Sequence, residues 1–349
     1  MSRPLAIAGR QIGPDRPPYV IAEMSGNHNG DISRALALIE AAAEAGADAV
    51  KLQTYTADTI TIDHDGPGFL IEGGLWDGRR LYELYEEAHT PWDWHPRLFE
   101  HARKVGITAF SSPFDPTAVA FLDGLGAPAF KVASFELVDT PLIGCMARTG
   151  KPLIMSTGLA SPEDIADAVA AARAEGADDI VLLHCTSGYP TPPSQMHLRT
   201  LTDLAARHGA LVGLSDHSMG TAVSVAAVAL GACVIEKHFT LARADGGPDA
   251  AFSLEPDELA RLVADCRAAW EALGGVHYEE VEAEKASREH RRSLYVVSDV
   301  AAGEVLTETN VRSIRPGHGM APKHLPEVLG RRATRDLKRG EPLAWGMVE

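Results

Sequence analysis

The sequence has few cysteines and no arrangement of them that predicts a covalent or metal framework. Its four cysteines, Cys145, Cys185, Cys233 and Cys266, lie far apart in a chain of 349 residues, and no CxxC pair occurs. Disulfide scaffolds and zinc knuckles depend on closely spaced cysteines, so both classes are excluded. We therefore expect four reduced, buried, structural thiols.

The chain also lacks long apolar runs and an excess of positive charge. Its longest apolar run, residues 223–235, is too short to cross a bilayer, and residues 1–13 hold no stretch long enough for a signal peptide. With 32 Lys and Arg against 48 Asp and Glu, the net charge is −16. Because this field repels nucleic acid and anionic membranes, we expect neither as a partner. We expect a cytoplasmic protein, in which a small anionic substrate would need local cations.

Short runs rich in Val, Ile, Leu and Phe alternate with amphipathic helical patterns over the first three quarters of the chain. The clearest helices are predicted over 31–46, 161–176 and 255–274, with Ser or Pro near their starts and Gly at their ends. Near-continuous apolar strands that alternate with helices predict a parallel sheet covered by helices, and eight such units in about 255 residues suit a closed (β/α)8 TIM barrel. The eight strands are predicted over 19–25, 49–55, 107–113, 129–136, 152–158, 180–187, 211–217 and 234–241.

A dinucleotide-binding Rossmann sheet is the alternative α/β fold for this pattern. Its fingerprint GxGxxG is missing after the first predicted strand, where residues 26–31 read GNHNGD. We therefore favour the barrel.

The composition of the sequence changes after residue 275. Residues 276–292 are charged and mostly helical in pattern, which predicts a linker between a barrel domain, 1–275, and a small domain, 293–349. Within the small domain the pattern Asp-apolar-x-x-Gly-Glu-x-Leu occurs twice, at 299–306 and 336–343, and predicts two related turns of a β-clip fold. About 60 residues are marginal for independent stability, so we expect this domain to dock on a barrel.

Polar residues end nearly every predicted strand, where a TIM barrel carries its active site. Lys51 and Lys131 each stand in an otherwise apolar strand, and a lysine is rarely buried there without an anion. Hydroxyl groups also stand near the strand ends of the same rim, at Ser112, Ser134, Ser156 and Ser215. Two cations with several hydroxyls predict a phosphate or carboxylate site. The alternative is that each lysine pairs with a glutamate inside the barrel.

Two histidines, His217 and His238, end the last two predicted strands, which are neighbours in a barrel. Beside the carboxylates of Glu23 and Asp216, two imidazoles and open water positions predict a divalent metal that acts as a Lewis acid. We expect Asp216 to orient one of the rings. The alternative is that each histidine is a hydrogen-bonded core residue; His95 and His101 are expected on a helix surface.

Ordered motifs along nearly the whole chain resemble the sialic acid synthase family of phosphoenolpyruvate-condensing enzymes. They include EMSGNHNG (23–30), KLQTYTADT (51–59), SSPFD (111–115), GLSDHSMG (213–220) and IEKHFTL (235–241). The segments RRSLYV (291–296) and SIRPGHG (313–319) are similar to the antifreeze-like (SAF) domain of that family. The resemblance implies a TIM barrel followed by a SAF domain, phosphoenolpyruvate and an amino sugar as substrates, and a domain-swapped homodimer.

Within the family the chain is most similar to pseudaminic acid synthases, in EMSGNHNG, LYELYEEAHTPWDWH (81–95) and RADGGPDAAFSLEP (243–256). N-acetylneuraminate synthases tend to carry a His soon after GPD, whereas Ala250, Ala251 and Phe252 follow Asp249 here. The departure makes the sugar site more apolar and suits a diacetamido-trideoxy-L-altrose acceptor. The alternatives are legionaminic or N-acetylneuraminic acid synthesis and, outside the family, a Schiff-base aldolase or a non-catalytic sugar- or ice-binding protein.

The resemblance also implies roles for individual residues. His217 and His238 match the ligands of a divalent metal (Mn2+, Mg2+ or Co2+), and with Glu23 and Glu136 they form the expected catalytic set. The positions that match phosphoenolpyruvate binding are Lys51, Ser112, Lys131, Ser134, Ser156 and Ser215. The positions that match sugar binding are Gln53, Tyr189, Asp249 and Arg315, of which Arg315 would be delivered to an acetamido group by the SAF domain. Ser187 departs from the family, where an Asn is common, and leaves that contact unassigned.

Overall fold

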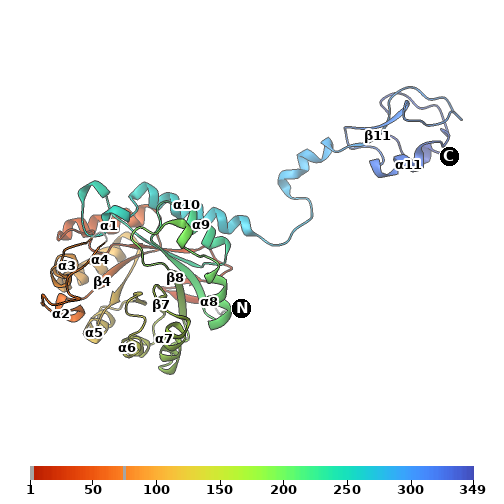
Figure 1. Ribbon diagram of the computed structural model, residues 1–349. Helices are drawn as coiled ribbons and strands as arrows, with labels where there is room; N and C mark the ends of the chain where they lie inside the picture. Colours follow the sequence, from red (N-terminus) through yellow and green to blue (C-terminus); the bar gives the residue numbers. More distant parts are fainter. Residues whose placement is uncertain (1–3, 74–75) are drawn as a thin grey trace. The chain divides into compact units, whose positions relative to one another are not determined.

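Eight parallel strands close into a barrel in the first part of the chain (Figure 1). The computed structural model describes residues 4–73 and 76–349, and the chain divides into two compact units, Met1–Gly274 and Gly275–Glu349. The strands follow one another around the barrel in chain order, and β10 pairs with β3 to close it. They are β3 (Tyr19–Glu23), β4 (Ala49–Thr54), β5 (Thr108–Pro113), β6 (Phe130–Val132), β7 (Leu153–Ser156), β8 (Ile180–Cys185), β9 (Leu211–Asp216) and β10 (Val234–His238). The predicted (β/α)8 fold is confirmed.

Helices cover the outside of the barrel, and their starts follow the chemistry of helix capping. Asp31 precedes α1 and accepts a hydrogen bond from the Ser33 amide, and Ser161 forms a capping box with Asp164 at the start of α7. The three helices predicted most clearly are found within two residues of each expected end, as α1 (Ile32–Glu44), α7 (Pro162–Ala174) and α10 (Pro256–Leu273). The others are α2 (Ala57–Ile60), α3 (Leu81–Ala88), α4 (His95–Val105), α5 (Pro116–Gly124), α6 (Thr140–Ala147), α8 (Thr200–His208) and α9 (Ala222–Ala229).

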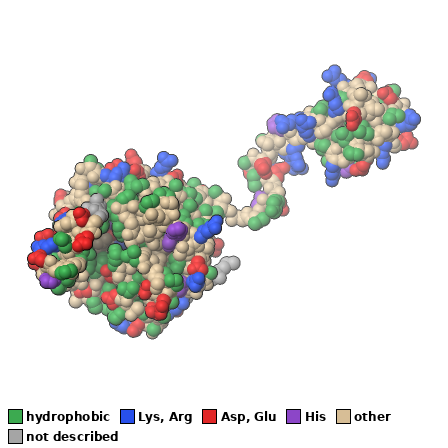
Figure 2. Space-filling view, in the orientation of Figure 1, with side chains coloured by type: hydrophobic (Ala, Val, Ile, Leu, Met, Phe, Trp, Pro, Cys, Tyr) green, Lys and Arg blue, Asp and Glu red, His purple; other side chains and the backbone are tan. Residues whose placement is uncertain are grey.

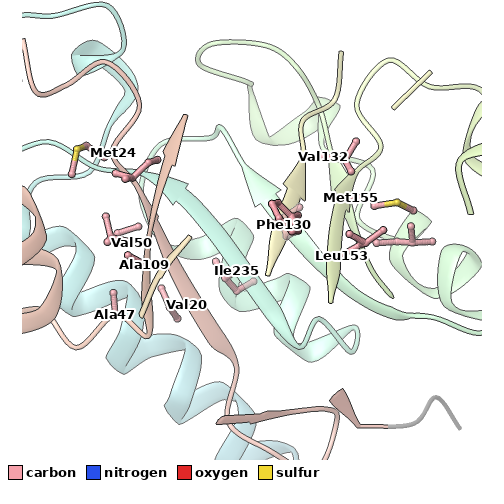
Figure 3. Close-up of a cluster of buried hydrophobic side chains, with 14 of the residues drawn as sticks. Val20, Met24, Ala47, Val50, Ala109, Phe130, Val132, Leu153, Met155 and Ile235 are labelled. Carbon is pink, nitrogen blue, oxygen red and sulfur yellow. The ribbon is translucent and has the colours of Figure 1, made fainter. Parts of the chain in front are cut away.

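The alternation of side chains along each strand separates two apolar layers. Val20, Val50 and Ile235 point outward and pack beneath the helices, in the cluster drawn in Figure 3. Residues one position away, such as Tyr19, Ala49 and others of a second buried cluster, fill the inside of the barrel. A hairpin of β1 (Leu5–Ile7) and β2 (Arg10–Ile12) adds its apolar residues to that inner cluster. The barrel is therefore a packed core up to the level where its inward side chains become polar.

The second unit is built on the repeated motif. Its strands β11 (Ser293–Val296) and β12 (Val311–Ile314) pair antiparallel. The two repeats pair with each other: Val300 and Leu337 exchange backbone hydrogen bonds of 3.0 and 2.9 Å. Asp299 accepts from the Arg339 amide of the other repeat, and Asp336 accepts from the Ala302 amide in return, both at 2.8 Å. The predicted pair of related turns is thus observed.

The linker predicted over 276–292 belongs to the second unit, where a 3-10 helix spans Glu282–His290 and every side chain of that helix is exposed. Lys and Arg side chains gather on the face of this unit that Figure 2 shows. Among the residues described, no helix has the length and apolar character needed to span a membrane.

Two expectations about individual side chains were wrong. His95 is fully buried rather than on a helix surface, because its ring at the start of α4 faces β4 and hydrogen-bonds Thr54 Oγ1 at 2.8 Å. All four cysteines are free, but Cys145 is only half-buried, whereas the other three are buried as expected.

Candidate active site

Near the carboxyl ends of the strands, here called the mouth of the barrel, the inward-facing positions change from apolar to polar. Lys131 on β6 and Glu236 on β10 stand on opposite sides of the barrel, yet Nζ and Oε1 lie 3.9 Å apart. Only side chains that point into the barrel can meet in this way. The buried polar layer consists of Glu23, Lys51, Ser112, Lys131, Ser156, Ser215 and Glu236.

Lys51 is balanced by carboxylates in this structure. Its Nζ lies 2.8 Å from Glu23 Oε2 and 3.4 Å from Glu236 Oε1, and it donates to Ser112 Oγ at 3.3 Å. Burial alone would lower the pKa of Lys51, but the two carboxylates more than offset this and raise its pKa above the ordinary lysine value. Lys51 therefore matches the alternative considered for both lysines, in which the ammonium group pairs with a glutamate inside the barrel.

The positive charge of Lys131 is less well compensated by nearby carboxylates than that of Lys51. It donates to Ser156 Oγ at 2.7 Å and to the Val132 carbonyl at 2.9 Å, which are both neutral groups. Burial lowers the pKa of Lys131 below the ordinary lysine value, since the Glu236 carboxylate at 3.9 Å compensates only in part. An incoming anion would supply the charge that this ammonium lacks.

The remaining two hydroxyls belong to Ser215 and Ser134. Ser215 Oγ lies 3.4 Å from Glu236 Oε1. Ser134 follows β6 and accepts a hydrogen bond of 3.2 Å from the Gly158 amide. A side chain at Gly158 would overlap the hydroxyls of Ser134 and Ser187 and force both to move from their present positions. The structure thus brings together five of the six residues that the sequence assigns to an anion, whereas Ser134 lies in the loop after β6 and contacts Gly158.

The two predicted metal ligands, His217 and His238, lie side by side, with ring centroids 5.4 Å apart. His217 Nδ1 is 3.0 Å from the Thr186 carbonyl, which can only accept, so this nitrogen carries a proton and the lone pair of the neutral ring is on Nε2. His238 Nδ1 is buried and has no hydrogen-bond partner. In the part of the chain that the structure describes, no group of three or more His, Cys, Asp or Glu side chains is arranged to hold a metal.

Asp216 does not orient either ring, so that prediction was wrong. Its carboxylate accepts from Lys237 Nζ at 2.8 Å, from Ser224 Oγ at 2.6 Å and from the amide and hydroxyl of Ser218. Neighbouring residues of a strand point to opposite faces, so Asp216 points to the helix layer while His217 points to the mouth.

Glu136 lies in the loop after β6 and is half-buried. Its Oε2 atom is buried without a hydrogen-bond partner. Burial raises the pKa of Glu136 to about 7. A carboxyl group with this pKa can gain or lose a proton near neutral pH.

Most of the predicted sugar-binding residues meet next to the histidines. Gln53 Nε2 donates to Glu23 Oε1 at 2.8 Å and to Ser25 Oγ at 3.1 Å, and the Ser25 hydroxyl donates to Asp249. The Tyr189 ring lies against the His217 ring, with centroids 4.3 Å apart. Arg315 belongs to the second unit, where it is exposed and has no hydrogen bond or ion pair with any residue described.

Two members of the site, Ser25 and Glu236, were missing from the residues assigned from the sequence. Glu236 was recognised only as a polar residue at the end of the last predicted strand, and its position two residues before His238 was the signal that could have given it a role in the site. No such signal existed for Ser25, because it follows β3 in a loop and reaches the site through its contact with Asp249, 224 positions away.

The fold and the side chains at the mouth define a (β/α)8-barrel enzyme. The NeuB family model matches residues 38–278 and the SAF domain model matches residues 291–349. The chain therefore belongs to the NeuB family of synthases, and the resemblance seen in its motifs is confirmed.

Individual relatives agree with this assignment. The chain is 45% identical to a pseudaminic acid synthase of Campylobacter jejuni, over 95% of this chain and 97% of the relative. It is 41% identical to a pseudaminic acid synthase of Helicobacter pylori, over 96% and 98%. Among solved structures, the N-acetylneuraminic acid synthetase of Leptospira borgpetersenii in complex with citrate matches with a TM-score of 0.73 and 32% identity, over 83% of this chain and 97% of that one.

Proposed function

We propose that this enzyme condenses phosphoenolpyruvate with a diacetamido-trideoxy-L-altrose to give pseudaminic acid and phosphate. The observation that carries the proposal is the 45% identity, over nearly the full length of both chains, to a protein named as a pseudaminic acid synthase. The apolar Ala250 and Phe252 beside Asp249 support an acceptor rich in methyl groups, since both are buried there.

In this proposal the phosphate and carboxylate of phosphoenolpyruvate bind to the buried polar layer. Lys131 contributes the cation with the least compensated charge, and Lys51 contributes a second, with hydroxyls of Ser112, Ser134, Ser156 and Ser215 as further donors. A dry barrel interior makes these contacts stronger than they would be in water.

The reaction joins C3 of phosphoenolpyruvate to the aldehyde carbon of the open-chain sugar, and positive charge develops at C2. Glu136 orients a water molecule and accepts its proton as the water oxygen bonds to C2, which its raised pKa allows near neutral pH. The C2–O bond to phosphate then breaks while the new C2 hydroxyl gives its proton to the departing phosphate, which leaves toward Lys51 and Lys131, and a 2-keto acid remains. The proton accepted by Glu136 passes to the oxygen of the former aldehyde. Holding both substrates at one mouth supplies much of the acceleration.

His217 and His238 would hold a divalent ion such as Mn2+, Mg2+ or Co2+. In its neutral form His217 offers a lone pair on Nε2, and His238 has a buried nitrogen without a hydrogen-bond partner. Burial lowers the pKa of His217, but Cys185 and the Thr186 carbonyl more than offset this and raise it above the ordinary value, so a bound ion would have to displace a proton from this ring. Burial lowers the pKa of His238 well below the ordinary value, so this ring stays neutral, as a metal ligand must be. When bound, the ion would supply Lewis-acid polarisation of the aldehyde.

The proposal is tested by phosphate release from phosphoenolpyruvate with Mn2+ or Mg2+ and three acceptors: the L-altrose sugar, its D-manno counterpart and N-acetylmannosamine. We expect release with the L-altrose sugar and loss of release in chelator. Release only with another acceptor would replace the product by legionaminic or N-acetylneuraminic acid. Borohydride trapping of a lysine with substrate would indicate a Schiff-base aldolase instead.

The role of Glu136 predicts a pH dependence. A pKa near 7 leaves the carboxylate protonated below that value, so kcat/KM should fall about tenfold for each pH unit below 7. The Glu136→Gln variant should lose about 10²-fold or more in kcat/KM and lack this limb. Ionisation of the substrates affects wild type and Glu136→Gln equally, so a difference between their pH profiles comes from the protein. The control is Glu100→Gln, which changes an exposed carboxylate on α4. If kcat/KM of Glu136→Gln still falls tenfold for each pH unit below 7, the group that titrates is not Glu136.

We also propose a homodimer in which the second unit of one subunit brings Arg315 to the acetamido group bound by its partner. Two observations support this: Arg315 is exposed and has no partner among residues 4–73 and 76–349, and the family resemblance assigns it this role. Mixing inactive Arg315→Ala and His217→Ala chains should restore part of the activity, because one of the mixed sites then has both residues intact. No recovery after verified subunit exchange would place Arg315 in its own subunit's site.

The four free thiols support a cytoplasmic location, which cell fractionation would check.

A further inference from the structure

The segment between α2 and α3 carries a tryptophan, Trp76, that no part of the proposed reaction uses. Backbone pairing joins the described residues 70–73 and 76–80 as the two sides of a hairpin: Leu70 and Arg80 form an antiparallel bridge, and Ile71 exchanges hydrogen bonds of 2.8 Å with Arg79 and Gly78. Arg80 secures the base of the hairpin through ion pairs with Asp63 at 2.8 Å and Glu83 at 2.6 Å. Trp76 is therefore presented on a built element.

Trp76 reaches across the mouth of the barrel. Its hairpin follows β4, whereas Tyr189 follows β8, and these strands are on opposite sides of the closed barrel. The ring centroids of Trp76 and Tyr189 are nevertheless 5.9 Å apart. The Trp76 indole Nε1 donates to the Pro248 carbonyl at 3.1 Å, in the loop after β10. One side chain thus contacts loops that follow two other strands.

These contacts create an aromatic wall, formed by Trp76, Tyr189 and Phe252. Tyr189 and Phe252 are in contact, with ring centroids 5.1 Å apart, and both adjoin the His238 ring, at 6.1 and 5.0 Å. The polar groups of the proposed sugar site include Glu23 and Gln53, from β3 and β4, and Asp249, from the same loop as Phe252. The site therefore combines the aromatic wall with polar groups from β3, β4 and the loop after β10.

We infer that Trp76 determines acceptor specificity, by offering its ring face to the methyl groups of the diacetamido-trideoxy sugar. This inference rests on the proposed function. The only polar atom of the indole is occupied by the Pro248 carbonyl, so the ring has an apolar surface alone to offer to a ligand. An apolar surface favours a methyl group over a hydroxyl, because the hydroxyl would lose hydrogen bonds to water.

The experiment compares kcat/KM of Trp76→Ala and wild type for the L-altrose sugar and N-acetylmannosamine, with inhibition constants for any acceptor that is not turned over. We expect a loss of about 10- to 200-fold for the diacetamido sugar and less than about threefold for N-acetylmannosamine, with the KM for phosphoenolpyruvate unchanged. Trp76→Phe should retain most of the preference, because it keeps a ring.

Ile62→Ala is the matched control, since it truncates another apolar side chain of the same segment that is 59% exposed. It should change neither acceptor. Equal losses for both acceptors in Trp76→Ala, or no loss at all, would overturn the inference. If wild type prefers a different acceptor, the proposed function fails, but the change in preference between variant and wild type still decides the role of Trp76.

Discussion

Replacing Lys131 by Met is expected to lower kcat/KM for phosphoenolpyruvate by about 10³-fold. Lys131 is the buried cation with the least compensation: its hydrogen-bond acceptors are neutral, and the Glu236 carboxylate lies 3.9 Å away. A methionine has a similar volume and no charge, so it removes the attraction to the phosphate or carboxylate while it fills the same space. Steady-state phosphate release over a range of phosphoenolpyruvate concentrations measures the loss.

The control for Lys131→Met is Lys104→Met on the surface of α4, where the side chain is 67% exposed and pairs with Glu100. This variant should behave as wild type. Near-normal kcat/KM for phosphoenolpyruvate in a folded Lys131→Met protein would show that Lys131 serves the structure of the barrel and not the substrate.

Replacing Lys237 by Met is expected to destabilise the barrel by about 3–5 kcal/mol. Lys237 and Asp216 form an ion pair of 2.8 Å in which both side chains are at most 1% exposed. Removal of one partner leaves the other charge buried without compensation. Three donors of Ser218 and Ser224 still reach Asp216, which places the expected loss at the lower end of the range. Urea denaturation measures it, from the midpoint at constant slope.

Two further variants make the Lys237 result specific. Adding Asp216→Asn to Lys237→Met should recover part of the loss, because it removes the uncompensated charge. Arg207→Met breaks an exposed pair with Asp203 on α8 and should cost less than about 1 kcal/mol. A Lys237→Met variant as stable as Arg207→Met would mean that the buried pair contributes no more than a surface pair.

Local patterns in the sequence predicted where the strands of the barrel lie along the chain. Each of the eight strands begins within one residue of its expected start, because an apolar run is needed wherever a strand is covered on both faces. The ends were less well predicted: β6 stops at Val132, although its run was extended to residue 136. The polar residues after Val132 leave the sheet and form the site, so they mark the end of the strand and not its continuation.

The residues of the proposed anion site could also be predicted from local patterns. Lys51, Lys131 and the serines were assigned from polar residues in apolar strands, and the structure places them together because parallel strands bring their carboxyl ends to one edge. The partners of the lysines could not be read in this way. Whether Glu236 lies nearer to Lys51 or to Lys131 depends on side chains that meet across the barrel.

By itself, therefore, the sequence determined the order of strands and helices, the repeated turns of the second unit and the residue types at the mouth of the barrel. These depend on periodicity and capping within a few residues. Only the tertiary structure decided that Asp216 faces Lys237 and not a histidine ring, and that Trp76 reaches Pro248, 172 positions away. Such contacts depend on which face a residue occupies and on where closure of the barrel brings distant loops, and no local pattern contains that information.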